Sequence, residues 1–129
     1  MRLGEDALHT WDIAVALDPA ATVPEDATGL LIDTLPPLVE RVARPGPEPL
    51  TVEVHTSTPD RRLRLQLTGD GARLTNTGGD DPVGTSLLTL PAEAFVRLVY
   101  GRLDPGHTPA SAQATALDLD ALRRSFPGF

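Results

Sequence analysis

The chain has 129 residues with a formal net charge of −7, and 40% of them are hydrophobic, enough for the core of one domain, alone or with an appended helical piece. An acidic surface repels phosphate groups, which argues against nucleic acid or an anionic membrane as a partner. The absence of cysteine excludes disulfides, thiolate metal ligands and a cysteine nucleophile. No signal peptide or membrane-spanning run is recognisable, so we expect a cytoplasmic protein.

The first predicted element is a helix over Leu3 to Leu17. It carries Glu5, His9 and Asp12 at i, i+4 and i+7, which places them on one helix face. A carboxylate and an imidazole one turn apart can hold the same divalent metal. The same spacing also fits a solvated helix face with no function. Glu5 and His9 are therefore two candidate metal ligands, and the sequence places no third ligand beside them.

A second helix is predicted to start at Thr22, since Thr22 and Glu25 have the spacing of a capping box. Leucine and valine residues between 31 and 42 then form one apolar stripe. Pro36 and Pro37 interrupt this stripe, and we expect a kink or a break there because each ring removes a backbone donor.

The proline-rich segment 44–49 is the only domain boundary that the sequence indicates. We expect a helical N-terminal segment over residues 1–44 and an α+β domain over residues 45–129. The second part contains four predicted strands, a helix that starts at Pro91, a short edge strand at 111–116 and a last helix capped by Asp118. The four strands are expected at residues 50–56, 62–68, 72–76 and 85–90, with a loop at 77–84.

These elements predict an α+β fold with an antiparallel sheet of four to five strands, helices packed on one face of the sheet, and two preceding N-terminal helices. The strand at 62–68 shows the pattern most clearly. Leu63, Leu65 and Leu67 alternate with polar residues, so we expect them to face the core while Arg64 and Gln66 face outward.

Few other side chains suggest chemistry. His55 falls on the polar side of a strand and His107 in a Gly-Pro loop, where both are expected at the surface. Arg102 follows the end of a predicted helix, where a cation is stabilised by the helix dipole. The functional alternative is that Arg102 anchors an anion, because a guanidinium binds carboxylates through two hydrogen bonds.

The segment from Glu5 to Ala14, with Glu5, His9, Trp11 and Asp12, resembles the E-x-x-x-H-x-W-D-L-A segment of the mycothiol-dependent maleylpyruvate isomerase family. Several later stretches are similar to the C-terminal domain of that family, namely 53–56, 60–62, 69–71 and 100–102. The resemblance covers nearly the whole chain. It implies the last helix of a DinB-like four-helix bundle followed by a domain like sterol carrier protein 2.

The resemblance also implies a function and site residues. The family binds a divalent metal, usually taken as zinc, through two histidines and a glutamate, and it uses mycothiol as a thiol cofactor. Glu5 and His9 match two of these ligands, Asp12 matches an aspartate beside them, and Arg102 is the candidate for a catalytic arginine from the C-terminal domain. Leu63 stands where the family has a tryptophan. The chain is therefore expected to be the C-terminal portion of such an enzyme and not catalytic on its own.

Two other functions remain open at this stage. The chain can be a stand-alone module of the sterol-carrier type that binds a small molecule or a protein, or a truncated piece that folds but is inactive. In the family the first helix is packed on all sides, and its apolar residues here are distributed around the helix. We therefore expect a homodimer through this helix, or a separate helical-bundle chain as partner. The residues that lead to this expectation are Leu8, Trp11, Ile13, Val15 and Leu17.

Overall fold

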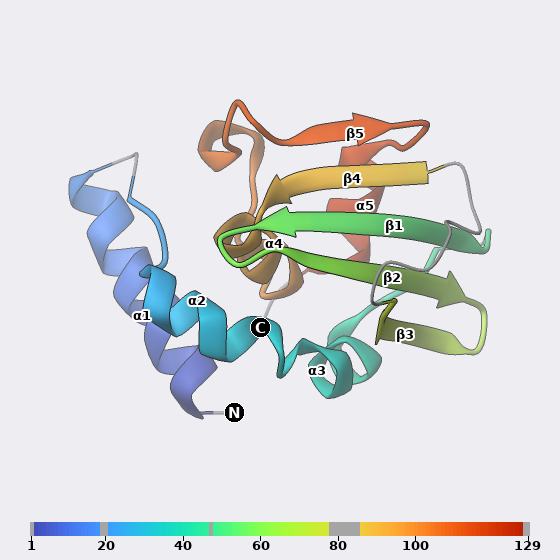
Figure 1. Ribbon diagram of the computed structural model, residues 1–129, viewed down its shortest axis with the longest axis horizontal. Coiled ribbons are helices and arrows are strands. Elements are labelled where there is room, and N and C mark those ends of the chain that lie inside the picture. Colours follow the sequence, from blue (N-terminus) through green and yellow to red (C-terminus); the bar gives the residue numbers. More distant parts are fainter. Residues whose placement is uncertain (1, 19–20, 47, 78–85, 128–129) are drawn as a thin grey trace.

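The computed structural model describes residues 2–18, 21–46, 48–77 and 86–127, and for residues 2–5 it describes the backbone only (Figure 1). The helices are α1 (Arg2–Leu17), α2 (Glu25–Ile32), α3 (Leu35–Val42), α4 (Ala92–Val99) and α5 (Leu119–Ser125), with a short 3-10 turn, η1 (Pro105–His107). The strands are β1 (Leu50–Ser57), β2 (Arg61–Thr68), β3 (Gly71–Asn76), β4 (Ser86–Pro91) and β5 (Gln113–Thr115). The predicted loop at 77–84 and the predicted start of the fourth strand at Thr85 lie almost wholly outside the described residues.

The five strands form one sheet in the order β3-β2-β1-β4-β5. Three of the four pairings are antiparallel, but β1 and β4 run parallel. The α+β class is confirmed, whereas the prediction of a wholly antiparallel sheet is wrong. The physical reason is that period-two alternation tells which face of a strand is buried and not which strand lies beside it.

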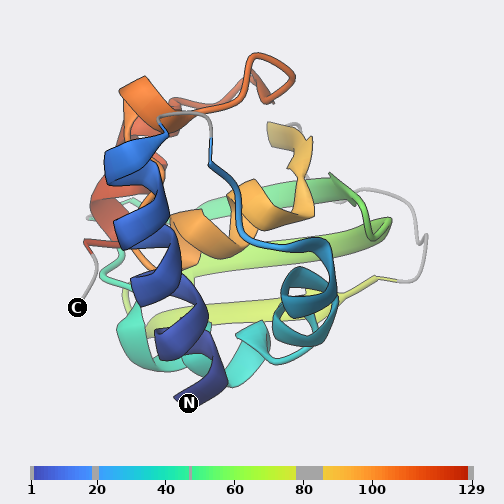
Figure 2. The same ribbon diagram turned by 90° about the vertical axis from the view of Figure 1, so that its left-hand side faces the viewer.

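The described helices are grouped on one side of the sheet and at one end of it. In Figure 1, α4 and α5 lie behind the strands, α1 and α2 lie beyond one end, and α3 lies next to β3. In Figure 2, seen from the left-hand side of Figure 1, α1 and α2 lie nearest the viewer and the strands run behind them. No helix in the part of the chain that the structure describes is long and apolar enough to cross a bilayer.

The predicted alternation along β2 is confirmed. Leu63, Leu65 and Leu67 are buried, and Gln66 between them is exposed. Arg64 also points away from the helices, but its Nε donates to Oε1 of Glu53 on β1 at 2.7 Å. The Glu53 residue is only 3% exposed, so a carboxylate on the side of the sheet opposite to Leu63 and Leu65 is nevertheless buried beside an arginine.

The N-terminal part contains three helices instead of the predicted two. The break at Pro36 and Pro37 is confirmed: α2 ends at Ile32, and α3 carries a proline in its first turn. Both prolines are tolerated at this place, because the amides of the first turn of a helix make no intrahelical hydrogen bond.

The capping box predicted at Thr22 and Glu25 is wrong. Pro24 occupies the N-cap position of α2, and no side chain there accepts a capping hydrogen bond. The neighbouring Val23 amide instead donates to Oε2 of Glu93 at 3.1 Å. This hydrogen bond joins the segment before α2 to α4, and local spacing gives no sign of a contact between residues seventy positions apart.

One hydrophobic core includes residues from both sides of the predicted boundary at residues 44 and 45. Leu8, Leu31 and Leu35 belong to the same buried cluster as Phe95 and Leu122. The connecting segment is also tied to the last helix, because the Arg44 amide donates to the carbonyl of Ser125 at 2.7 Å. The division into two domains stays a prediction.

Candidate functional site

Arg102 is positioned by the end of α4. The Gly101 amide donates to the Leu98 carbonyl at 3.0 Å, and the Arg102 amide donates to the Arg97 carbonyl at 2.6 Å. This is the Schellman pattern of helix termination, which needs a left-handed residue, and Gly101 has φ +76°. The glycine therefore turns the chain so that Arg102 leaves the helix in a fixed direction.

The Arg102 side chain reaches across to α1. Its Nε lies 2.9 Å from Oδ1 of Asp12, and its Nη2 lies 3.0 Å from Oδ2. A third hydrogen bond joins Nη1 to the Tyr100 carbonyl at 2.9 Å. The two-point contact is the geometry in which arginine binds a carboxylate most specifically. The structure thus brings together two residues that the sequence analysis had singled out separately, and the carboxylate that Arg102 binds here is that of Asp12 in the same chain.

Trp11, the residue before Asp12, is an apolar contact between α1 and the rest of the chain. It is 6% exposed, and its indole N–H donates to the Ala21 carbonyl at 2.8 Å. The guanidinium carbon of Arg97 lies 5.0 Å from the ring centre, a cation–π distance. The ring of His107 meets the indole edge-on at 5.8 Å between centres. His107, predicted at the surface, is therefore half-buried.

Arg97, whose guanidinium lies over the Trp11 ring, was missed by the sequence analysis. It is 2% exposed, and its Nε and Nη2 bind the two carboxylate oxygens of Glu93 at 2.8 and 2.7 Å. Its Nη1 donates to the His107 carbonyl at 2.8 Å. The available sequence signal was the Glu93–Arg97 spacing, because a glutamate four residues before an arginine forms a favourable pair on a helix.

The candidate metal ligands lie on the same helix as Asp12. The His9 side chain is exposed, while the side chain of Glu5 lies outside the described part of the chain. Among the residues that the structure describes, no three histidine, aspartate or glutamate side chains are grouped closely enough to hold a metal ion. His107 pairs through Nδ1 with Oδ1 of Asp104 at 2.7 Å, and in the described part of the chain no third such group joins this pair.

A cavity of about 470 Å³ lies between α5, the start of β1, the end of β2 and the segment that precedes β1. It is called the α5 cavity below. Leu50, Leu67 and Leu117 supply apolar lining, and Arg44 and Arg124 supply two cations. The remaining residues around it are Gly46, Glu48, Pro49, Ala116, Asp118, Ala121 and Ser125.

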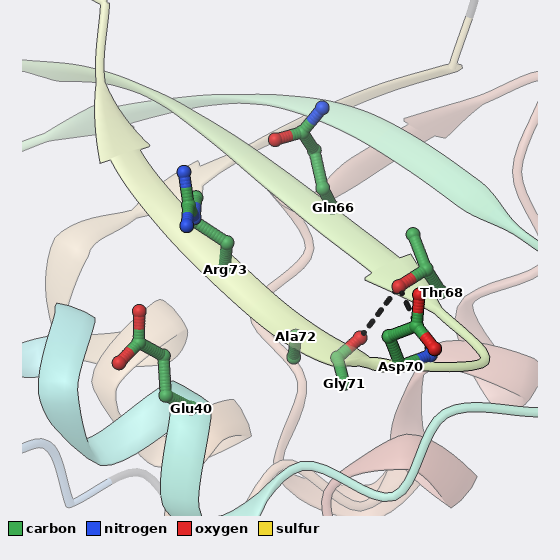
Figure 3. A pocket seen from close by; sticks show the side chains of 7 residues that line it. All are labelled: Glu40, Gln66, Thr68, Asp70, Gly71, Ala72 and Arg73. Carbon is green, nitrogen blue, oxygen red and sulfur yellow. Dashed lines mark hydrogen bonds between the residues drawn. The ribbon is translucent and has the colours of Figure 1, made fainter.

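A second hollow of about 460 Å³ lies at the edge of the sheet beside β3 (Figure 3). Glu40 from α3 and Arg73 from β3 lie on either side of it, and Thr68 and Asp70 belong to the turn at one end. The hydrogen bonds there stay within the turn, from Thr68 Oγ1 to the Gly71 carbonyl and from the Asp70 amide to Thr68 Oγ1. These side chains are exposed, so this hollow lacks the buried polar groups that fix a ligand.

Comparison with known proteins adds no assignment. No protein-family model matches the sequence, and no curated protein matches it either.

Proposed function

We propose that this chain is the C-terminal portion of a protein of the mycothiol-dependent maleylpyruvate isomerase type, with a domain like sterol carrier protein 2, and that it is not catalytic on its own. The observation that supports this proposal is the contact between Arg102 and Asp12. The resemblance implies that the C-terminal domain lends an arginine to a site on the last bundle helix. Arg102 reaches that helix, three residues along from His9.

The residues of this chain do not by themselves fit the implied zinc ion. A catalytic zinc site takes about three protein ligands and keeps one position open. Glu5 and His9 supply two ligands, and no described residue near them supplies a third. No reaction step is therefore assigned to the metal or to mycothiol. The role assigned to Arg102 is to bind the carboxylate of a substrate, which would replace the Asp12 carboxylate or share the guanidinium with it.

The proposal also includes a helical partner for α1, either a second copy of the chain or a separate bundle. Leu8 and Trp11 are buried against their own chain, so only part of the apolar surface of this helix is left for a partner. Ile13 and Leu17 are 69% and 86% exposed and lie one turn apart on the same side of the helix. A partner helix would cover these two side chains.

Zinc titration tests the proposal. We expect affinity weaker than roughly micromolar, because Glu5 and His9 leave half of a tetrahedral shell to water. His9→Ala should change the calorimetric titration little. Submicromolar binding that disappears in both Glu5→Ala and His9→Ala would show that the chain completes a metal site by itself, and it would contradict the non-catalytic assignment.

A second function, a stand-alone module that binds a small molecule, is favoured by the α5 cavity. Its volume falls within the roughly 300–1,000 Å³ that is typical of ligand sites, and its lining combines apolar side chains with a few polar groups. This function needs neither a metal nor a bundle.

A further inference from the structure

We infer that a pocket beside the start of α4 binds a small, uncharged aromatic molecule that carries one O–H or N–H donor, with this donor bound to Nε2 of His107. The pocket has a volume of about 290 Å³ and is called the α4 pocket below. It is separate from the α5 cavity, and neither Asp12 nor Arg102 is among the described residues that line it. The inference goes beyond both proposed functions and depends on neither of them.

The apolar lining of the α4 pocket comes from three segments that are distant in the sequence. Ala21 precedes α2, Pro91 ends β4, and Pro109 belongs to the loop after η1. An aromatic ring that enters the pocket leaves water, and a rigid ring loses little conformational entropy on binding. Proline side chains also pack well against aromatic rings. The volume lies just below the roughly 300–1,000 Å³ that is typical of drug-sized ligands, so the pocket suits a single ring.

The two charged side chains that line the α4 pocket, Glu93 and Arg97, are paired with each other. Their side chains are 12% and 3% exposed, and two hydrogen bonds of 2.8 and 2.7 Å join them. Oε2 of Glu93 also accepts from the Val23 amide, and Nη1 of Arg97 donates to the His107 carbonyl. A charged ligand would leave water without gaining an ion pair, because the opposite charge is already neutralised. The pocket therefore favours an uncharged ligand.

His107 offers this ligand a hydrogen-bond acceptor. Its Nδ1 lies 2.7 Å from Oδ1 of Asp104, and because a carboxylate only accepts, the proton of the neutral imidazole is assigned to Nδ1. Nε2 is then an acceptor, and no residue in the described part of the chain donates to it. A ligand that places an O–H or N–H group at Nε2 completes the hydrogen bonding of the imidazole.

The imidazole is held in place before a ligand arrives. On one side Asp104 binds Nδ1, and the ring also meets the indole of Trp11 edge-on, with 5.8 Å between the ring centres. The carbonyl of the same residue accepts from the buried Arg97 guanidinium at 2.8 Å. An acceptor that is oriented in this way costs little ordering on binding, which favours affinity in a small site.

The test uses phenol and anisole, two uncharged rings of which only phenol has a donor, followed by nuclear magnetic resonance of the backbone amides of the full chain. We expect both to shift the amides of Thr22, Gly106 and Thr108, and phenol to bind about fivefold more tightly. His107→Phe keeps an aromatic ring beside Trp11 but removes Nε2, so phenol should bind about fivefold more weakly and anisole as before. His55→Phe, the same change at a half-buried histidine on β1, should leave both affinities unchanged.

Two charged rings, benzoate and benzylammonium, test whether the ligand is uncharged. We expect each to bind at least about tenfold more weakly than phenol, because neither finds an unpaired opposite charge in the α4 pocket. Binding of either ring as tight as that of phenol would overturn the assignment of an uncharged ligand.

A further variant tests the location of the site. Ala21→Leu narrows the α4 pocket and should abolish the binding of both probes, while the backbone carbonyl that accepts from Trp11 is kept and circular dichroism should show the same cooperative unfolding. Equal affinity for phenol and anisole, with no effect of His107→Phe, would overturn the role of His107. The amide shifts of the parent protein locate the site independently of the variant. No shift at Thr22, Gly106 and Thr108 with either probe, or shifts that persist in Ala21→Leu, would overturn the site itself.

Discussion

Leu65→Asp is expected to unfold the protein. Leu65 lies at the centre of β2 with no exposed surface, between Val52 of β1 and Leu74 of β3. An unpaired carboxylate at this position costs several kcal/mol, comparable with a total stability of about 5–15 kcal/mol. Circular dichroism during thermal unfolding would detect the loss of the cooperative transition.

The matched control is Gln66→Asp, which introduces the same residue at the exposed neighbouring position. It should change the free energy of unfolding by no more than about 0.5 kcal/mol. Arg64→Ala is a poorer control than the strand pattern suggests, because it removes the charged partner of the buried Glu53 carboxylate. Equal melting temperatures for Leu65→Asp and Gln66→Asp would mean that the register of β2 is wrong by one residue.

Arg97→Ala is expected to lower the free energy of unfolding by about 3–5 kcal/mol, the usual cost of removing one partner of a buried ion pair. The substitution leaves the Glu93 carboxylate without its two-point contact and the His107 carbonyl without the Nη1 donor. It also removes the cation that lies over the Trp11 ring. Urea unfolding of the variant and the parent protein measures this difference.

The control for this experiment is Arg124→Ala, which removes the same charge from a side chain that is 72% exposed. A change within about 0.5 kcal/mol is expected for it. If Arg97→Ala proved as mild as Arg124→Ala, the buried network between α4 and α1 would not exist as described.

Much of the fold could be predicted from the sequence because the relevant signals are local. Alternation placed Leu63, Leu65 and Leu67 on the core side of β2, and a single aspartate marked the start of α5: Oδ1 of Asp118 accepts from the Asp120 amide as expected. The parallel neighbour of β1 could not be predicted in this way, because strand order depends on contacts between distant segments.

In the candidate site, too, local positions could be predicted from the sequence and contacts between distant residues could not. Asp12 and Arg102 were each recognised from their position on a helix, but nothing in their spacing indicates that residues ninety positions apart form an ion pair. Arg97 was missed because arginine is rarely buried unless it is paired. Its burial here depends on Glu93 and on a carbonyl of the following loop.

The central claim is that α1 is docked on the C-terminal part of the chain through Trp11, Arg97 and Arg102. Trp11 is the single tryptophan, so its fluorescence reports this contact directly. We expect acrylamide to quench the native protein much less than the urea-unfolded protein, since the indole is 6% exposed. Arg102→Ala, which removes the bond to Asp12, should increase the quenching without abolishing the cooperative unfolding of the sheet. Native quenching equal to that of the unfolded chain would contradict the docked position of α1.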